Sequence, residues 1–225
     1  MKRILAAIIA AALLLSGCTS ASRPAESAPP TGTPSPSPTP VVTPTPEPEP
    51  ADGELVLVRD YIPGIFIDLK YATTDNFTGQ VIYDSDEAYL RYGTVKKLLC
   101  AQNELSGRGL SLKIWDAYRP VSAQFKLWEI CPNPVYVSDP NNGYSKHSRA
   151  NTVDITLVTD TGKSIPMPSG FDDFTSLADR DYSDVSDEAA ENARLLENVM
   201  VENGFVPYSG EWWHYSDSVA YDVYG

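Results

Sequence analysis

The sequence predicts a single α+β domain with a mostly antiparallel central sheet flanked by helices. Two observations lead to this prediction. Strand-like apolar runs and long helical stripes follow one another without the regular strand–helix alternation that a parallel sheet needs. Apolar residues make up 42% of the 225-residue chain, which is enough for a hydrophobic core. A chain of this length accommodates one ordinary domain with tails.

The individual elements follow from local patterns along the chain. Apolar runs bounded by turn residues predict strands. These strands are expected at residues 55–58, 65–69, 110–115, 152–158 and 205–215. Apolar side chains spaced three and four residues apart predict helices. These helices are expected at residues 86–105, 121–130 and 187–203, each followed by a nearby glycine or proline that stops it.

The N-terminus has the layout of a secretory signal. Lys2 and Arg3 precede the apolar run Ile4–Leu15, which is shorter than the roughly 20 residues of a membrane-spanning helix. Small residues then lead to Cys18, a pattern that resembles the lipobox of bacterial lipoproteins. We expect residues 1–17 to be a lipoprotein signal peptide, with the mature protein extracytoplasmic and anchored to the cell membrane through a lipid on Cys18. An ordinary secretory signal or an uncleaved anchor is the alternative.

A linker separates this signal from the folded domain. Residues 19–50 contain 11 of the 19 prolines and no aromatic residue. Such a segment buries little apolar surface and favours extended, polyproline-like backbone. We therefore expect the lipidated Cys18 and a Pro/Ser/Thr-rich disordered linker at residues 18–52, and the folded domain at residues 53–225.

Charge and cysteine content narrow the function further. The formal net charge is −13, whereas a nucleic-acid-binding protein needs a face rich in Lys and Arg. No nucleic-acid partner is therefore expected. Outside the signal, Cys100 and Cys131 can pair in an oxidising compartment or remain buried free thiols. The sequence leaves that choice open.

A histidine and a strand aspartate form the first candidate metal-binding pair. Asp154 lies among β-branched residues of a predicted strand, where a carboxylate is poorly placed unless it is solvated or bound. His147 lies in the polar loop seven residues earlier. A loop histidine and an aspartate at a strand start can converge on one metal ion, although this pair alone is a weak signal.

The second candidate feature is the segment Gly210–Tyr215, which contains the only other histidine of the chain. His214 follows Glu211 by three residues, with two tryptophans between them. One interpretation is an aromatic core strand with a satisfied histidine. The other makes His214 a third ligand beside His147 and Asp154, with Glu211 as general base. Three protein ligands leave the fourth zinc position open, as catalysis requires.

The third candidate is Arg119, which follows the predicted strand at residues 110–115. Its guanidinium stays charged at any working pH and donates in a fixed fork. Near a zinc site it would stabilise the oxyanion of a tetrahedral intermediate. The alternative is an ordinary ion pair with one of the 30 acidic residues.

These motifs together resemble the D-alanyl-D-alanine dipeptidases of the VanX type, in a zinc peptidase family that also contains D,D-carboxypeptidases. The matching stretches keep the family order and cover essentially the whole predicted domain. They are residues 68–73, 76–79, 115–120, 145–149, 154–157, 171–172 and 211–214.

The resemblance implies a role for each candidate residue. It implies one zinc ion per chain held by His147, Asp154 and His214, with Glu211 as the base and Arg119 supporting the oxyanion. Three further residues match positions that bind the free ammonium group of the substrate or line its pocket. They are Asp172, Ser145 and Tyr71. The implied reaction is zinc-dependent hydrolysis of D-Ala-D-Ala to two D-alanines in cell-wall peptide metabolism.

Two other functions fit the same motifs. A D,D-carboxypeptidase would remove the terminal D-Ala from peptidoglycan stem peptides, which are found outside the membrane. A zinc-stabilised wall-binding module without turnover would not need Glu211 or Arg119. The sequence also departs from the family pattern, because Ala150 replaces a glycine and Thr152 replaces an alanine. If that glycine has a positive φ, alanine costs about 1 kcal/mol there.

Overall fold

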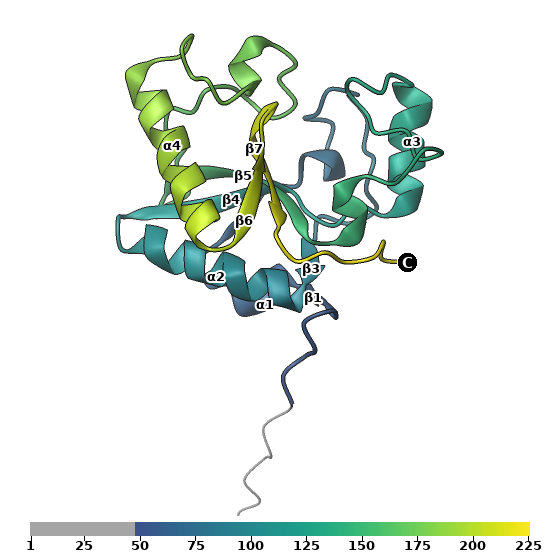
Figure 1. Ribbon diagram of the computed structural model, residues 1–225, viewed down its shortest axis with the longest axis horizontal. Helices are drawn as coiled ribbons and strands as arrows, with labels where there is room; N and C mark the ends of the chain where they lie inside the picture. The colour runs from purple at the N-terminus through teal and green to yellow at the C-terminus, as the bar shows by residue number, and fades with distance from the viewer. Residues whose placement is uncertain (1–47) are drawn as a thin grey trace, which may run out of the picture. The chain divides into compact units, whose positions relative to one another are not determined.

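A five-stranded sheet forms the centre of the structure, for which the computed structural model describes residues 48–225 (Figure 1). The predicted signal peptide, Cys18 and nearly all of the predicted linker lie outside the described residues. Within residues 48–225, no helix combines the length and the apolar character that crossing a membrane requires.

The sheet has the order β2-β4-β5-β7-β6. Its strands are β2 (Phe66–Ile67), β4 (Leu110–Asp116), β5 (Thr152–Thr159), β6 (Phe205–Tyr208) and β7 (Glu211–Asp217). Only β2 and β4 are parallel, and the other neighbours are antiparallel. The prediction of an α+β domain with a mostly antiparallel sheet is confirmed.

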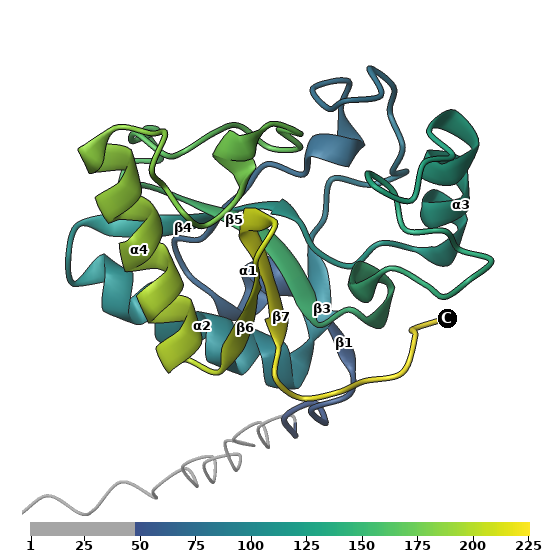
Figure 2. The ribbon, with the colours of Figure 1, turned by 45° about the horizontal axis from the view of Figure 1, so that its top comes forward.

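Helices cover the sheet, and shorter helical turns lie in its connections. The helices are α1 (Val58–Tyr61), α2 (Tyr92–Ser106), α3 (Val121–Ile130) and α4 (Asp187–Glu202). The 3₁₀ turns are η1 (Lys70–Ala72), η2 (Lys146–Arg149) and η3 (Ser176–Ala178). Figures 1 and 2 show α2 and α4 together on one side of the sheet and α3 apart from them with the long loops.

The central strand β5 explains how the core and the polar face are separated. Val153, Ile155 and Leu157 belong to the hydrophobic core cluster, which α2 and α4 complete with residues such as Leu98 and Leu196. Because side chains alternate along a strand, Asp154 and its polar neighbours face the other way. That face is also buried, since every residue from 152 to 158 is.

The predicted helix at residues 86–105 is too long at its start. Residues Tyr89–Arg91 instead form strand β3, which pairs antiparallel with β1 (Leu55–Leu57) as a separate two-stranded sheet. Helix α2 begins at Tyr92. The strand exists because β1 supplies its hydrogen-bond partners, which no pattern within residues 86–91 can reveal. Elsewhere β4, α3, β5, α4 and the β6–β7 pair lie where predicted, within a residue or two.

Candidate active site

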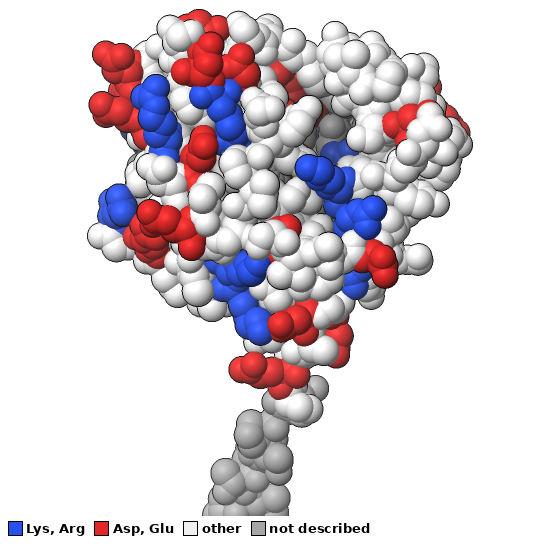
Figure 3. Space-filling view, in the orientation of Figure 1, with Lys and Arg blue, Asp and Glu red and all other residues white. Residues whose placement is uncertain are grey.

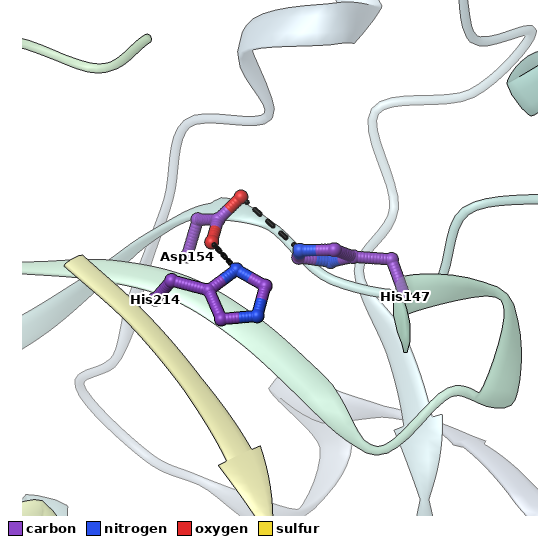
Figure 4. Close-up of side chains that lie close together, drawn as sticks. All are labelled: His147, Asp154 and His214. Atoms are coloured by element: carbon purple, nitrogen blue, oxygen red, sulfur yellow. Dashed lines mark hydrogen bonds and ion pairs between the residues drawn. The ribbon is translucent and has the colours of Figure 1, made fainter. Parts of the chain in front are cut away.

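Two neighbouring strands and one turn bring together the three candidate metal ligands. Asp154 on β5 is the direct cross-strand partner of His214 on β7. His147 comes from η2, the turn just before β5. Figure 4 shows both imidazole rings beside Asp154, each facing a different carboxylate oxygen.

The distances within this group fit a metal ion. Nε2 of His147 lies 3.2 Å from Oδ2 of Asp154, and Nδ1 of His214 lies 3.0 Å from Oδ1. One ligand atom from each of the three side chains lies within 4.8 Å of the others. Donors around a tetrahedral zinc ion, each about 2.1 Å from it, are roughly 3.3 Å apart. The donor set of two imidazoles and a carboxylate is also one that zinc accepts.

Electrostatics hold Asp154 ionised in this group. Burial opposes the charge, but the charge of His147 and hydrogen bonds from both histidines lower the pKa of Asp154 below its ordinary value. Burial likewise opposes charge on His147, and the carboxylates of Asp154 and Asp116 raise its pKa overall. The cluster therefore attracts positive charge strongly, whether from protons or from a metal cation.

A backbone carbonyl orients His147. Nδ1 of its ring lies 2.8 Å from the carbonyl oxygen of Ala117. A carbonyl oxygen only accepts hydrogen bonds, so Nδ1 carries a hydrogen, and Nε2 is the nitrogen that would bind a metal ion in place of its own hydrogen. Ser145 caps the turn, with its Oγ accepting from the amide of His147 at 3.2 Å.

Both departures from the family pattern lie in the connection between η2 and β5. Ala150 has a φ of 58°, so the left-handed conformation suspected there is confirmed. Its Cβ is fully buried, which leaves the backbone little freedom to relax. The buried Thr152 has a partner for its hydroxyl, because its Oγ1 lies 3.0 Å from Oγ of Ser216 on β7. With both residues in place, His147 and Asp154 still meet, at 3.2 Å between Nε2 and Oδ2.

Glu211 lies beside the ligand group, where a general base is expected. Its Oε2 is 3.4 Å from Nδ1 of His214. Burial, together with the negative charge of Asp154, raises the pKa of Glu211 above its ordinary value. A carboxylate with a raised pKa is a better proton acceptor near neutral pH.

A buried polar network fixes Arg119. Its Nη2 donates to Asp116 at 2.6 Å, and its Nη1 donates to Gln124 at 3.0 Å. Asp116 also accepts from the hydroxyl of Tyr83 at 2.5 Å and lies 3.5 Å from Nδ1 of His147. Asp116 thus links the arginine to a metal ligand. Asp116 was not predicted to take part in the site. Like Asp154, it is an acidic residue in a buried strand, and this pattern could have identified it from the sequence.

Asp172 and Tyr71 meet on a different side of the site. The hydroxyl of Tyr71 donates to Oδ2 of Asp172 at 2.8 Å. The Tyr71 ring in turn lies against the guanidinium of Arg119, at 5.0 Å from ring centroid to Cζ. Burial, together with the negative charge of Asp154, raises the pKa of Asp172 to about 7, although the hydrogen bond from Tyr71 opposes this shift. This carboxylate lacks a cationic partner among the described residues, and an ammonium group would supply one.

A pocket of about 260 Å³ opens at the metal-ligand group. It is lined by Pro134, Val135, Tyr136, Ser138, Ser145, Lys146, Tyr208, Glu211 and His214. Figure 3 shows a hollow in this face of the molecule, with basic side chains beside it. Three of these residues were not predicted from the sequence: Tyr136, Lys146 and Tyr208. Loops and the edge of β6 bring them to the pocket, and local sequence patterns do not show such placements.

Every predicted site residue within the described part of the chain lies in or next to this site. His147 and His214 both contact Asp154, and Glu211 contacts His214. Arg119, Tyr71 and Asp172 form a connected second group. Cys18 lies outside the described residues. Cys100 and Cys131 are both free thiols, but neither is buried: Cys100 is exposed and Cys131 is half-buried.

The chain is similar in sequence to known proteins over most of the described residues. A family model described as D-ala-D-ala dipeptidase matches residues 51–222. A D-alanyl-D-alanine dipeptidase of Escherichia coli (strain K12) is 39% identical over 162 residues, covering 72% of this chain and 83% of that protein. The dipeptidase of Streptomyces coelicolor is 36% identical over 188 residues, covering 73% and 91%. That of Enterococcus faecium is 35% identical over 176 residues, covering 69% and 87%. A solved structure titled VanYB in complex with D-Alanine-D-Alanine has a TM-score of 0.41 and 17% identity, covering 60% of this chain and 75% of that one.

Proposed function

The chain belongs to the D-alanyl-D-alanine dipeptidase family of peptidases, and from this premise we propose that it hydrolyses D-Ala-D-Ala to two D-alanines. One zinc ion per chain is held by His147, Asp154 and His214. The observation that carries the proposal is the contact of this ligand group with Glu211, at 3.4 Å from His214. A structural metal site has no need of a carboxylate base beside it.

Glu211 moves the protons of this reaction. A metal ion bound by the three ligands supplies a Lewis acid that polarises a carbonyl and acidifies water. Glu211 accepts a proton from the attacking water, whose oxygen adds to the peptide carbonyl carbon. When the C–N bond breaks, Glu211 gives that proton to the leaving amine. Its raised pKa suits both steps near neutral pH.

Arg119 stabilises the negative charge that develops on the carbonyl oxygen. Its bonds to Asp116 and Gln124, with a longer one to Tyr83, use three of its five N–H groups. The remaining two can donate to the substrate oxygen. Because the guanidinium is already held rigidly, little reorganisation is needed when the charge forms.

Asp172 recognises the free ammonium group of the dipeptide. An ammonium group beside Asp172 favours the ionised carboxylate and so offsets the effect of burial on its pKa. Tyr71 already donates to one carboxylate oxygen and orients the other. Ser145 lines the pocket with its hydroxyl hydrogen available, because its Oγ accepts from His147 and need not donate there. A substrate acylated on its nitrogen has no ammonium group for this contact.

The same proposal includes the cellular location. The layout of residues 1–18 supports export with a lipid on Cys18, so the protein contacts the membrane only through this anchor. Replacement of Cys18 by alanine is expected to move the protein from the membrane fraction to the soluble one. Retention of the variant in the membrane fraction would contradict lipid anchoring.

The decisive experiment measures D-alanine released from D-Ala-D-Ala, with and without a zinc chelator. N-acetyl-D-Ala-D-Ala serves as the matched substrate without an ammonium group. Release from the free dipeptide that is lost with chelator and restored by zinc supports the proposal. Preferred cleavage of the acylated substrate would favour a D,D-carboxypeptidase. Zinc binding without any release would favour a non-catalytic wall-binding module.

A further inference from the structure

Glu211 and His214 meet although they are three residues apart on one strand. In a regular strand the side chains alternate, so residues three apart point to opposite faces. Here their side chains approach to 3.4 Å. The backbone of this segment therefore departs from the regular pleat.

The neighbouring strands do not enforce this irregular backbone. Pairing between β5 and β7 extends from Thr152–Ser216 only to Asp154–His214. On the β6 side the register shifts between Pro207 and Tyr208, and a proline has no N–H group to donate. Tyr208 pairs with Glu211 instead of His214, so residues 212–214 have no partner on β6 and form a bulge between two paired positions.

The guanidinium of Arg180 holds this part of the hairpin by its carbonyl oxygens. Nε donates to the carbonyl of Tyr208 at 2.7 Å. Nη2 donates to the carbonyls of Glu211 at 3.0 Å and His214 at 3.2 Å. Carbonyls three residues apart also point in opposite directions in a regular strand. A single nitrogen atom that reaches both therefore stabilises the irregular conformation.

Helix α4 and strand β7 also supply side chains that fix the guanidinium of Arg180. Nη1 donates to Oε2 of Glu197 on α4 at 2.9 Å and to the hydroxyl of Tyr215 at 3.1 Å. The guanidinium carbon also lies 4.7 Å from the centre of the Tyr215 ring. These contacts use all five N–H groups of the guanidinium. The clamp is therefore anchored to α4, which packs on the sheet.

We propose that Arg180 is a positioning residue that sets Glu211 and His214 side by side. This inference rests on the proposed function, because it assigns the geometry of the base and of one ligand to a residue that touches neither side chain. A lysine in its place keeps the charge, but its three hydrogens radiate from one nitrogen. It cannot reach Tyr208, Glu211 and His214 while it is held by Glu197.

The test compares the Arg180→Lys variant with wild type, with Arg194→Lys on α4 as the matched exchange. Arg194 is exposed and lies against Tyr182, away from the hairpin carbonyls. Three quantities are measured: zinc affinity by chelator competition, the visible spectrum of the cobalt-substituted protein, and kcat and KM for D-Ala-D-Ala. Arg180→Lys is expected to lower zinc affinity or kcat per metal-loaded site about 10- to 100-fold and to alter the cobalt spectrum. KM is expected to change little, because Asp172 is held by the hydroxyl of Tyr71 and not by Arg180. Arg194→Lys is expected to change none of these quantities.

A role in stability alone gives a different result. If Arg180→Lys lowers only the melting temperature, with zinc affinity, cobalt spectrum and kcat per loaded site unchanged, the inference is wrong. The zinc and cobalt measurements need no substrate, so they test Arg180 even if wild type does not cleave D-Ala-D-Ala. If the variant does not fold, arginine side-chain NMR of wild type decides. Slow rotation of the Arg180 Nη groups supports the clamp, and freely averaged Nη hydrogens contradict it.

Discussion

The metal side and the ammonium side of the site are built in different ways. Asp154 and His214 are directly paired residues of adjacent strands, so the sheet itself sets their separation. Asp172 lies in a loop with a left-handed backbone, at a φ of 52°, and meets Tyr71 from the turn η1. Under the proposed function, the chemistry depends on the strands, whereas substrate selection depends on loops that can change at little cost to the fold. Substitutions on the metal side are expected to abolish turnover, and those on the loop side to change it by degrees.

The largest effect is expected from removal of a ligand. His214→Ala leaves two protein donors, so it is expected to lose both tightly bound zinc and measurable turnover. Metal content after dialysis and D-alanine release check the two losses together. A variant that keeps stoichiometric zinc would show that His214 is not a ligand. It would then also be wrong that strand pairing sets the geometry of the metal side.

Replacement of Glu211 is expected to separate metal binding from turnover. Glu211→Ala, or the closer isostere Glu211→Gln, is expected to keep zinc but lose about 10²- to 10⁴-fold in kcat, the usual contribution of a general base. The measurement is kcat per bound zinc ion, with wild type as the reference. Turnover close to wild type in the zinc-loaded variant would remove Glu211 as the base.

The loop side is expected to respond with a graded change. Asp172→Asn removes the negative charge, and asparagine tolerates the left-handed backbone well. Loss of a charged hydrogen bond of about 1.5–3 kcal/mol predicts a KM for D-Ala-D-Ala raised about 10- to 100-fold, with little change in zinc content. Cleavage of N-acetyl-D-Ala-D-Ala is expected to be much less affected. Equal losses on both substrates would contradict the assignment of Asp172 to the ammonium group.

The Asp172→Asn substitution, which is expected to weaken substrate binding, is expected to stabilise the folded protein near neutral pH. The pKa of Asp172 is raised to about 7 in the folded protein, from 3.8, so the folded state holds a proton that the unfolded state has lost. Wild type is therefore expected to lose stability relative to Asp172→Asn as pH rises from about 4 to 7, by up to about 4 kcal/mol, and to level off above pH 7. Urea unfolding of the metal-free proteins across this range checks it. A difference that does not depend on pH would mean that Asp172 titrates normally.

The sequence predicted the site residues that lie on strands more readily than the residues that hold them in position. Within a strand, Asp154 among β-branched residues is a local anomaly, and the two scarce histidines restrict the remaining choices. The partners of Asp116, the strand β3 and the clamp by Arg180 depend on contacts between residues distant along the chain. Periodicity and composition carry no information about such contacts, since both are local properties. The kink that brings Glu211 to His214 is for the same reason visible only in the structure.

Ala150 provides the smallest expected effect, because three contributions nearly cancel there. Glycine at this position relieves the left-handed strain of alanine, worth about 1–2 kcal/mol. It also removes a fully buried methyl group, worth about 0.8 kcal/mol, and adds about 0.5–1 kcal/mol of backbone entropy to the unfolded chain. Ala150→Gly is therefore expected to change the unfolding free energy by less than about 1 kcal/mol in urea titrations. Turnover is expected to stay the same, because the carbonyl of Ala117 and the cap of Ser145 orient His147 independently of residue 150. A large gain in kcat with glycine would instead mean that the turn η2 limits the chemistry, and that the metal side is less firmly fixed by the sheet than the strand pairing implies.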